Sequence, residues 1–169
     1  MIRLIALLFV VSCITAQARV GETLTQCIAR YGPVVEKQPA KLAVSDKEAC
    51  VFSRNGITIV AEFKAGIAWR VAYRMVDFDT DTLANLLSAN ALESGWSKAL
   101  RLGSQDVRAT PNRERIAIFT TGKRTMDPST LEVTSADYGK ANRKDYETKL
   151  ATVSDVVKSR IGSDPTKPF

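Results

Sequence analysis

Residues 49–76 read ACVFSRNGITIVAEFKAGIAWRVAYRMV, and this stretch decides the fold. Runs rich in β-branched and aromatic residues lie on both sides of Asn55-Gly56. Asn-Gly between two such runs predicts a type I′ hairpin, because that turn needs a positive φ at both central residues. A two-residue loop pairs Phe52 with Ile59, so these two side chains lie on the same side of the sheet.

A second turn is expected at residues 64–66, which are Lys-Ala-Gly. A two-residue loop would mix polar and apolar side chains on both faces, whereas a three-residue loop with a bulge at Gly66 keeps the apolar stripe together. We therefore predict the three-residue loop, which pairs Ala61 with Trp69 and leaves the opposite face mixed, small and solvated. The face expected to be buried carries Cys50, Phe52, Ile57, Ile59, Ala61, Phe63, Ile67, Trp69, Val71, Tyr73 and Met75.

A short amphipathic helix is expected to cover this buried face. Thr23 and Gln26 have the spacing of a capping box, in which each residue bonds the backbone N–H of the other. Apolar residues then recur at helical spacing until Gly32 and Pro33 end the pattern. The sequence thus predicts a helix over 24–31.

The rest of the chain repeats this order of elements, helix first and strands afterwards. A helix is expected over about 80–90, capped by Asp79 or Thr80, and no structure is assigned to the polar connection 34–48. The fold class is therefore α+β: antiparallel sheet(s) with helices packed on one face, a degenerate αβββ duplication over 24–76 and 80–134, and a C-terminal helix. The remaining expected elements are strands over 96–102, 106–110, 115–120 and 130–134, and a helix from about 136 with an apolar stripe at Leu150, Val153, Val157 and Ile161.

Residues 1–18 have the pattern of a secretory signal peptide. A cationic start is followed by a short apolar run, and Ala16-Gln17-Ala18 forms a small-x-small cleavage site. We expect cleavage before Arg19 and export to the periplasm or the exterior. Lipidation of Cys13, in a sequence similar to a lipobox, is the alternative.

The mature chain is expected to hold one domain over 19–162 and a frayed tail over 163–169. No later stretch is long and apolar enough to span a bilayer, so no transmembrane segment is expected in it.

The chain is basic, with a formal net charge of +6. Removal of residues 1–18 takes away only Arg3 among the charged residues and leaves +5. In an exported protein this charge favours an anionic envelope component or an acidic envelope protein as partner. Basic residues in the second half form a candidate anion-binding edge: Arg108, Arg113, Arg115, Lys123 and Arg124.

Several kinds of site are excluded by residue type. The chain has no histidine, which removes His-based nucleophilic catalysis and the commonest metal ligand. The two mature cysteines are too few for a structural zinc site, and no glycine-rich phosphate loop is present. Nucleic-acid binding is not expected, because only Phe119 lies among the basic residues and stacking needs interleaved aromatic residues. No catalytic residue, metal ligand or cofactor is predicted.

The run Asp77-x-Asp79-x-Asp81 begins like a calcium loop. It fails further on, because Thr82 occupies the position that requires Gly and Ser88 the position that requires a bidentate Glu. Carboxylates at the N-terminus of a helix are the better interpretation.

Cys27 and Cys50 are expected on facing elements, the first on the apolar stripe of the helix and the second on the core face of the sheet. An exported chain lies in a disulfide-permissive space, so this is a candidate disulfide. Two buried free thiols are the alternative.

Residues 21–33, GETLTQCIARYGP, resemble the opening of a group of small exported bacterial proteins of unknown function. A Phe-x-x-x-Gly-x-x-Ile pattern follows from Phe52 to Ile59, and the resemblance covers about the first 75 residues. The order of elements is also similar to β-lactamase-inhibitor-like modules and to small outer-membrane-assembly lipoproteins. That similarity implies a binding module and brings no activity with it.

The sequence favours an exported, non-catalytic binding or accessory module of the cell envelope. A small histidine-free hydrolase that uses paired carboxylates is the alternative. Glu62 is the one carboxylate beside a large aromatic residue, Trp69, but the expected register places the two on opposite faces.

Overall fold

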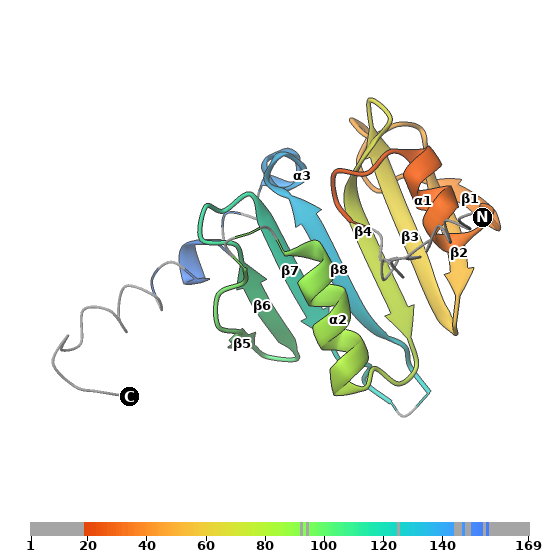
Figure 1. The fold of residues 1–169 in the computed structure, drawn as a ribbon. Coiled ribbons are helices and arrows are strands. Elements are labelled where there is room, and N and C mark those ends of the chain that lie inside the picture. The colour runs from red at the N-terminus through yellow and green to blue at the C-terminus, as the bar shows by residue number, and fades with distance from the viewer. Residues whose placement is uncertain are drawn as a thin grey trace, which may run out of the picture.

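The computed structural model describes residues 19–91, 93, 95–124, 126–143, 147, 150–153 and 155. Eight antiparallel strands form one sheet in the order β1-β2-β3-β4-β8-β7-β6-β5, and α1 and α2 lie across the same face of it (Figure 1). The predicted α+β class is confirmed. The elements are α1 (Leu24–Tyr31), β1 (Glu36–Pro39), β2 (Glu48–Arg54), β3 (Ile57–Lys64), β4 (Ile67–Met75), α2 (Thr80–Asn90), β5 (Leu100–Leu102), β6 (Gln105–Ala109), β7 (Arg115–Thr120), β8 (Ser129–Ser135) and α3 (Ala136–Ala141).

The order of elements repeats in the two halves of the chain. Each half is a helix followed by four antiparallel strands, and the halves join where β4 pairs with β8 at the middle of the sheet. The unit is thus αββββ rather than the expected αβββ. The extra strand of the first half is β1, which lies inside the connection to which no structure was assigned.

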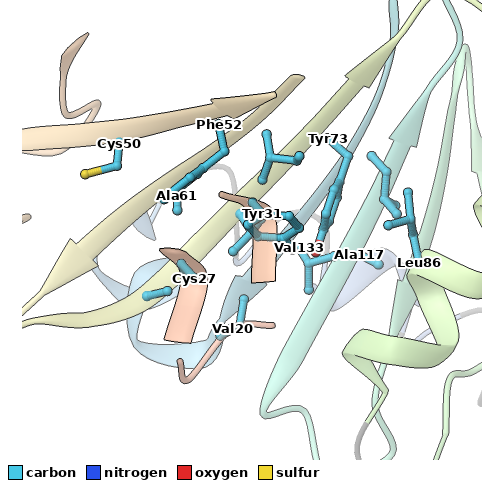
Figure 2. Close-up of a cluster of buried hydrophobic side chains, with 14 of the residues drawn as sticks. Val20, Cys27, Tyr31, Cys50, Phe52, Ala61, Tyr73, Leu86, Ala117 and Val133 are labelled. Carbon is cyan, nitrogen blue, oxygen red and sulfur yellow. The ribbon is translucent and has the colours of Figure 1, made fainter. Parts of the chain in front are cut away.

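Helix α1 begins and ends at the predicted residues. Thr23 N–H donates to Gln26 Oε1 at 2.8 Å, and the N–H of Gln26 donates back to Thr23 Oγ1 at 3.3 Å. Gly32 has φ 91° and follows the last helical turn. The helix buries Tyr31, whose ring centroid lies 5.5 Å from that of Phe52 on β2 (Figure 2).

The first hairpin forms as predicted, with φ of 51° at Asn55 and 76° at Gly56 and with Phe52 opposite Ile59. The second does not: Lys64 pairs with Ile67, so the turn has two residues. The predicted three-residue loop is wrong.

A bulge in β4 returns the apolar side chains that follow this shorter turn to the core face of the sheet. Phe63 pairs with Ala68 and Glu62 pairs with Arg70, so Trp69 is the extra residue on β4. One extra residue changes which side the following residues face, and Val71 and Tyr73 therefore still lie in the core. Ile67 is 41 % exposed, and Ala68 occupies the core position next to it.

The bulge turns Trp69 to the face opposite α1, contrary to the sequence prediction. Its ring packs edge-on against Tyr138 of α3, with centroids 5.1 Å apart. The Arg70 guanidinium lies 6.0 Å from the same Tyr138 ring and pairs with Glu62. Glu62 and Trp69 therefore lie on the same face of the sheet.

The face opposite α1 is not solvated, which corrects a second expectation. Val60 and Ala72 pack there with Ala49 and Val51, and all four are buried. Farther along this face, Val153 packs against Val107, Ala109 and Ile116, and half-buried Leu150 also contacts that cluster. The predicted stripe partners Val157 and Ile161 lie outside the described residues.

Residues 40–47 cross this second face as a strap. The N–H of Asp46 donates to the carbonyl of Phe63 at 2.7 Å. The Asp46 carboxylate accepts from the N–H groups of Ala65 and Gly66, each at 3.1 Å. The strap is thus tied to the β3–β4 turn. No helix among the described residues is long and apolar enough to cross a membrane.

Candidate functional site

A hollow of about 680 Å³ opens where β4 leads into α2 and where the β7–β8 loop passes beside that connection. Three features of the sequence meet there: the acidic run before α2, two phenylalanines and two of the predicted anion-binding residues. The hollow is lined by Val76, Asp77, Phe78, Asp79, Phe119, Thr121, Gly122, Lys123, Arg124, Asp127 and Ser129.

Asp79 caps the N-terminus of α2. Its Oδ1 accepts from the N–H of Thr82 at 2.6 Å and its Oδ2 from the Thr82 hydroxyl at 2.7 Å. These hydrogen bonds to the carboxylate lower the pKa of Asp79 below its usual value. The helix-cap interpretation of the acidic run is therefore confirmed for Asp79. Within the described chain, no group of three acidic or cysteine residues could hold a metal ion.

In the β7–β8 loop, Arg124 and Asp127 are joined by two hydrogen bonds. The N–H of Arg124 donates to Asp127 Oδ2 at 3.1 Å, and the N–H of Asp127 donates to the Arg124 carbonyl at 3.0 Å. Gly122 passes so close to this turn that a Cβ would lie 2.1 Å from the Asp127 carbonyl oxygen. The side chains of Lys123 and Arg124 are exposed and form no hydrogen bond or ion pair with any described residue.

The aromatic part of the lining comes from both halves of the fold. Phe78 precedes α2, Phe119 lies on β7, and their rings meet edge-on with centroids 5.6 Å apart. The hollow therefore combines an apolar contact, two carboxylates used in local turns, the carboxylate of Asp77 and two uncommitted cationic side chains. Lys and Arg side chains carry the donors that phosphate and carboxylate groups accept from.

The other basic residues of the predicted edge lie elsewhere. Arg113 lies in the β6–β7 turn with φ 60°, and Arg115 begins β7. Arg113 and Arg115 thus lie at the start of β7, whereas Lys123 follows its end, and the six residues of that strand span roughly 17 Å. Arg108 lies near α2, where it lines a small gap with Leu83. The five residues do not form one edge, and anion binding remains a prediction for the pair in the hollow.

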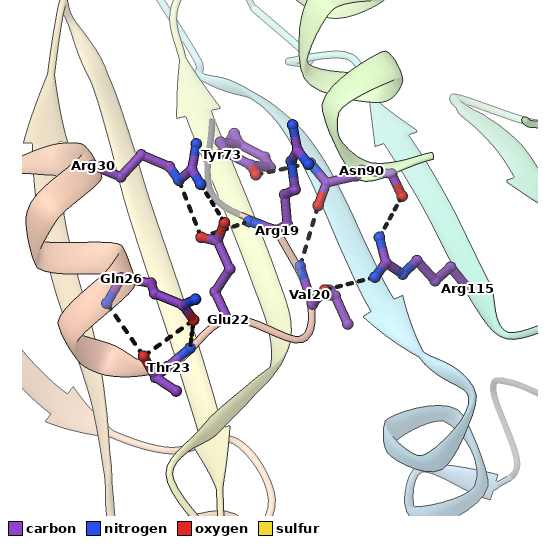
Figure 3. A network of polar contacts seen from close by, with 9 residues as sticks. All are labelled: Arg19, Val20, Glu22, Thr23, Gln26, Arg30, Tyr73, Asn90 and Arg115. Carbon is purple, nitrogen blue, oxygen red and sulfur yellow. Dashed lines mark hydrogen bonds and ion pairs between the residues drawn. The ribbon is translucent and has the colours of Figure 1, made fainter. Parts of the chain in front are cut away.

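A polar network around the first described residues was missed by sequence reasoning (Figure 3). Asn90, at the end of α2, is fully buried; its Oδ1 accepts from the N–H of Val20 at 3.3 Å and its Nδ2 donates to Tyr73 Oη at 2.9 Å. Glu22 pairs with Arg30 at 2.5 Å. Glu22 and Arg30 belong to the GET and RYG parts of the opening motif, so the motif residues meet across the start of α1.

A buried charge cluster on the opposite face was also missed. Arg70, 2 % exposed, bridges Glu62 at 2.7 Å and Glu132 at 2.7 Å, and Lys41 of the strap lies 3.5 Å from Glu132. Burial raises the pKa of Glu132, but the hydrogen bonds and charges of Arg70 and Lys41 outweigh it and the pKa is lowered. Arg70 thus holds the two carboxylates apart, with Glu62 buried and the side chain of Glu132 23 % exposed.

Cys27 and Cys50 are both buried free thiols in the described chain. Burial raises the pKa of Cys27 to about 12 and raises that of Cys50 as well. Figure 2 shows the two residues in the same core cluster, on α1 and β2. The disulfide is thus not confirmed, and the structure has the alternative, two buried free thiols.

No protein-family model matches the chain, and no curated protein sequence matches it. Among solved structures, it is similar to an extracellular protein containing an SCP domain from Bacillus anthracis, with a TM-score of 0.45 and 9 % identity over 85 % of this chain and 59 % of that chain. It is also similar to a cysteine-rich secretory protein from Staphylococcus aureus, with a TM-score of 0.42 and 7 % identity over 71 % of this chain and 46 % of that chain. The chain spans about half the length of these structures. With similarity this low, only the residues of the chain itself can indicate a function.

Proposed function

We propose that the protein is an exported, non-catalytic binding module of the cell envelope, and that the hollow beside α2 takes an anionic group of its partner. The observation that carries the proposal is the pair Lys123 and Arg124. Both side chains are exposed at a concave surface and are paired with no described residue, while Asp79 and Asp127 beside them accept hydrogen bonds from nearby backbone N–H groups.

The sequence of residues 1–18 supports export. The net charge of the mature chain supports an anionic partner. A mature chain of net charge +5 is attracted to the anionic surfaces of an envelope. Phosphate and carboxylate groups of lipids or glycans, and acidic side chains of an envelope protein, all present the chemistry that a Lys–Arg pair recognises. We commit to a phosphate-bearing envelope component, because the Phe78–Phe119 contact offers it an apolar neighbour.

The hydrolase alternative has one observation in its favour, since Asp77, Asp79 and Asp127 line the same hollow. A glycosidase needs one carboxylic acid that remains protonated near neutral pH. Asp79 has the opposite property, because its pKa is lowered. The proton donor of a hydrolase would therefore be Asp77 or Asp127, with Asp79 suited only to the ionised role. The loss of a hydrolytic activity in Asp77→Asn or Asp127→Asn protein would favour a hydrolase over a binding module.

The proposal is tested with lipid vesicles and the exported protein. We expect binding to phosphatidylglycerol vesicles and none to phosphatidylcholine vesicles, with the affinity falling as salt is added. The double variant Lys123→Glu/Arg124→Glu should bind roughly 25-fold or more weakly, on the basis of about 1 kcal/mol for each basic residue near an anionic surface.

The matched control is Lys47→Glu/Arg54→Glu, which changes the net charge equally at exposed positions outside the hollow lining. An equal loss in the control would show general surface attraction and contradict a site in the hollow. Inorganic phosphate as competitor separates the two sources of the same chemistry: displacement at millimolar phosphate indicates a site for free phosphate, and resistance indicates a headgroup in a membrane. Absence of binding to every anionic probe would overturn the proposal.

A further inference from the structure

The backbone nitrogen of Arg19 lies beside the carboxylate of Glu22. Arg19 N is 3.3 Å from Glu22 Oε2, and Glu22 is only 9 % exposed (Figure 3). The same carboxylate accepts from Arg30 Nη2 at 2.5 Å and from Arg30 Nε at 3.2 Å. The position of Arg19 N therefore matters electrostatically, because any charge placed on it would face a carboxylate that is nearly removed from water.

The chain around Arg19 is held at this position by contacts that do not involve the nitrogen itself. Val20 is 4 % exposed; its N–H donates to Asn90 Oδ1 at 3.3 Å and its carbonyl accepts from Arg115 Nη2 at 2.8 Å. The N–H of Gly21 donates to the carbonyl of Ala68 at 2.6 Å. Partners 70 and 95 residues away thus fix the backbone on the C-terminal side of Arg19, and the nitrogen has little freedom to move away from Glu22.

Cleavage before Arg19 would change the chemistry of this nitrogen. In the precursor it is an amide with one N–H and no charge. Hydrolysis adds water across the Ala18–Arg19 peptide bond, leaves a carboxylate on Ala18, and gives Arg19 an amine that takes up a proton near neutral pH. The product is an ammonium group with three donors and one positive charge, placed where the amide was.

We propose that signal-peptide cleavage completes the fold, because the new α-ammonium of Arg19 forms an ion pair with Glu22. Glu22 is then shared between two cations, Arg30 on α1 and the chain terminus. The hydrogen bond at Arg19 N already has an ionised acceptor; cleavage gives it an ionised donor as well, so the contact becomes an ion pair. The mature protein is consequently more stable than the same domain with residues still attached to Arg19. The inference rests on the export that forms part of the proposed function.

The test is a double-mutant cycle on protein exported by a host and purified from its envelope. Insertion of one Ala between Ala18 and Arg19 gives a mature chain that begins one residue earlier, so that Arg19 N is again an amide. Both chains are prepared with Glu22 and with Glu22→Gln, their N-termini are verified by mass spectrometry, and their unfolding by urea is compared. With Glu22, the insertion should raise the unfolding equilibrium constant roughly five- to thirtyfold. With Glu22→Gln, it should change it by less than about twofold.

Equal effects of the insertion in both backgrounds would overturn the proposal, as would a mature N-terminus at a residue other than Arg19. If Glu22→Gln protein does not accumulate, Arg30→Gln replaces it in the cycle. In Arg30→Gln protein the ammonium is the stronger of the remaining partners of Glu22. The insertion should therefore raise the unfolding equilibrium constant by a larger factor than it does in the parent protein. An equal factor in the two proteins contradicts the proposal. None of these measurements involves a ligand, so they can fail while the hollow still binds its partner.

Discussion

The guanidinium of Arg115 donates from Nη2 to the carbonyl of Val20, a residue 95 positions earlier, at 2.8 Å, and from Nη1 to the carbonyl of Asn90 at 2.8 Å. One side chain on β7 thus holds the start of the domain and the end of α2 together. Burial lowers the pKa of Arg115, as expected for a cation that is partly removed from water. This contact ties the first described residues to the second half of the fold.

Replacement of Arg115 should therefore destabilise the whole domain. Arg115→Met keeps much of the aliphatic stem but leaves two carbonyl groups without their donor, and we expect a loss of about 2–4 kcal/mol in the free energy of unfolding. Urea unfolding measures it. Arg54→Met, at the exposed end of β2, is the control and should change the free energy by less than about 0.5 kcal/mol. Equal stability of the two variants would show that the Arg115 contact contributes nothing.

The turn at Asn55-Gly56 sets the register of the first hairpin, and its Gly has φ 76°. A β-branched residue is strained in that region, so Gly56→Val should destabilise the protein by at least about 1–2 kcal/mol. Asn55→Gly, at a neighbouring position with φ 51°, is the matched control and should be nearly neutral, because glycine adopts this conformation readily. Thermal unfolding compares the three proteins, and an unchanged midpoint for Gly56→Val would contradict the assigned role of the turn.

Stability should fall in acid partly through Glu132. Its pKa is lowered in the folded protein by Arg70 and Lys41, so its contribution is complete above the ordinary glutamate pKa of about 4.3 and is lost as the pH falls through the lower folded value. The lowered pKa of Asp79 acts with the same sign. Unfolding by urea is measured between about pH 6 and pH 3.

In that experiment Glu132→Gln should be less stable than the parent near neutral pH and should lose less stability on acidification. Asp79→Asn keeps a capping side chain and serves as the control for the second carboxylate, so that the two contributions are separated. Parallel pH profiles for the parent and Glu132→Gln would mean that the pair with Arg70 does not favour the ionised form of Glu132.

The thiols of Cys27 and Cys50 should react slowly in the folded protein and rapidly after unfolding. Both are buried, and the raised pKa values leave very little thiolate near neutral pH. A colorimetric thiol assay on exported protein, unfolded without reductant, should count two thiols per mature chain and one in Cys27→Ala. A count of zero in the unfolded parent would show that the disulfide predicted from the sequence forms after export.

Local signals in the sequence were sufficient for much of the fold. The capping box at Thr23 and the Asn55-Gly56 turn are short-range devices, and each of them determined an element and its end correctly. The turn at Ala65 was predicted wrongly because the apolar stripe can be kept together in two ways, by a longer loop or by a bulge farther along the strand. The sequence shows only that apolar and polar residues alternate along the strand. Packing of Trp69 against Tyr138 favours the bulge.

The residues of the candidate site and of the polar clusters were predicted less completely, because they are brought together by long-range contacts. Lys123 and Arg124 were found as basic residues in a polar loop, but their position beside Asp79 follows from the pairing of β7 with β8 and the path from β4 to α2. Glu62 and Arg70 were assigned to a solvated face, since nothing local shows that the strap and α3 cover them. Glu22 likewise carried no signal apart from its place in the opening motif.

The mass of the protein recovered from the host envelope shows whether the exported domain begins at Arg19 with a free ammonium group. We expect the mass of residues 19–169 with an unmodified N-terminus. A protein that retains Met1, a chain that begins at Cys13 with a lipid attached, or a mature end displaced from Arg19 would contradict it.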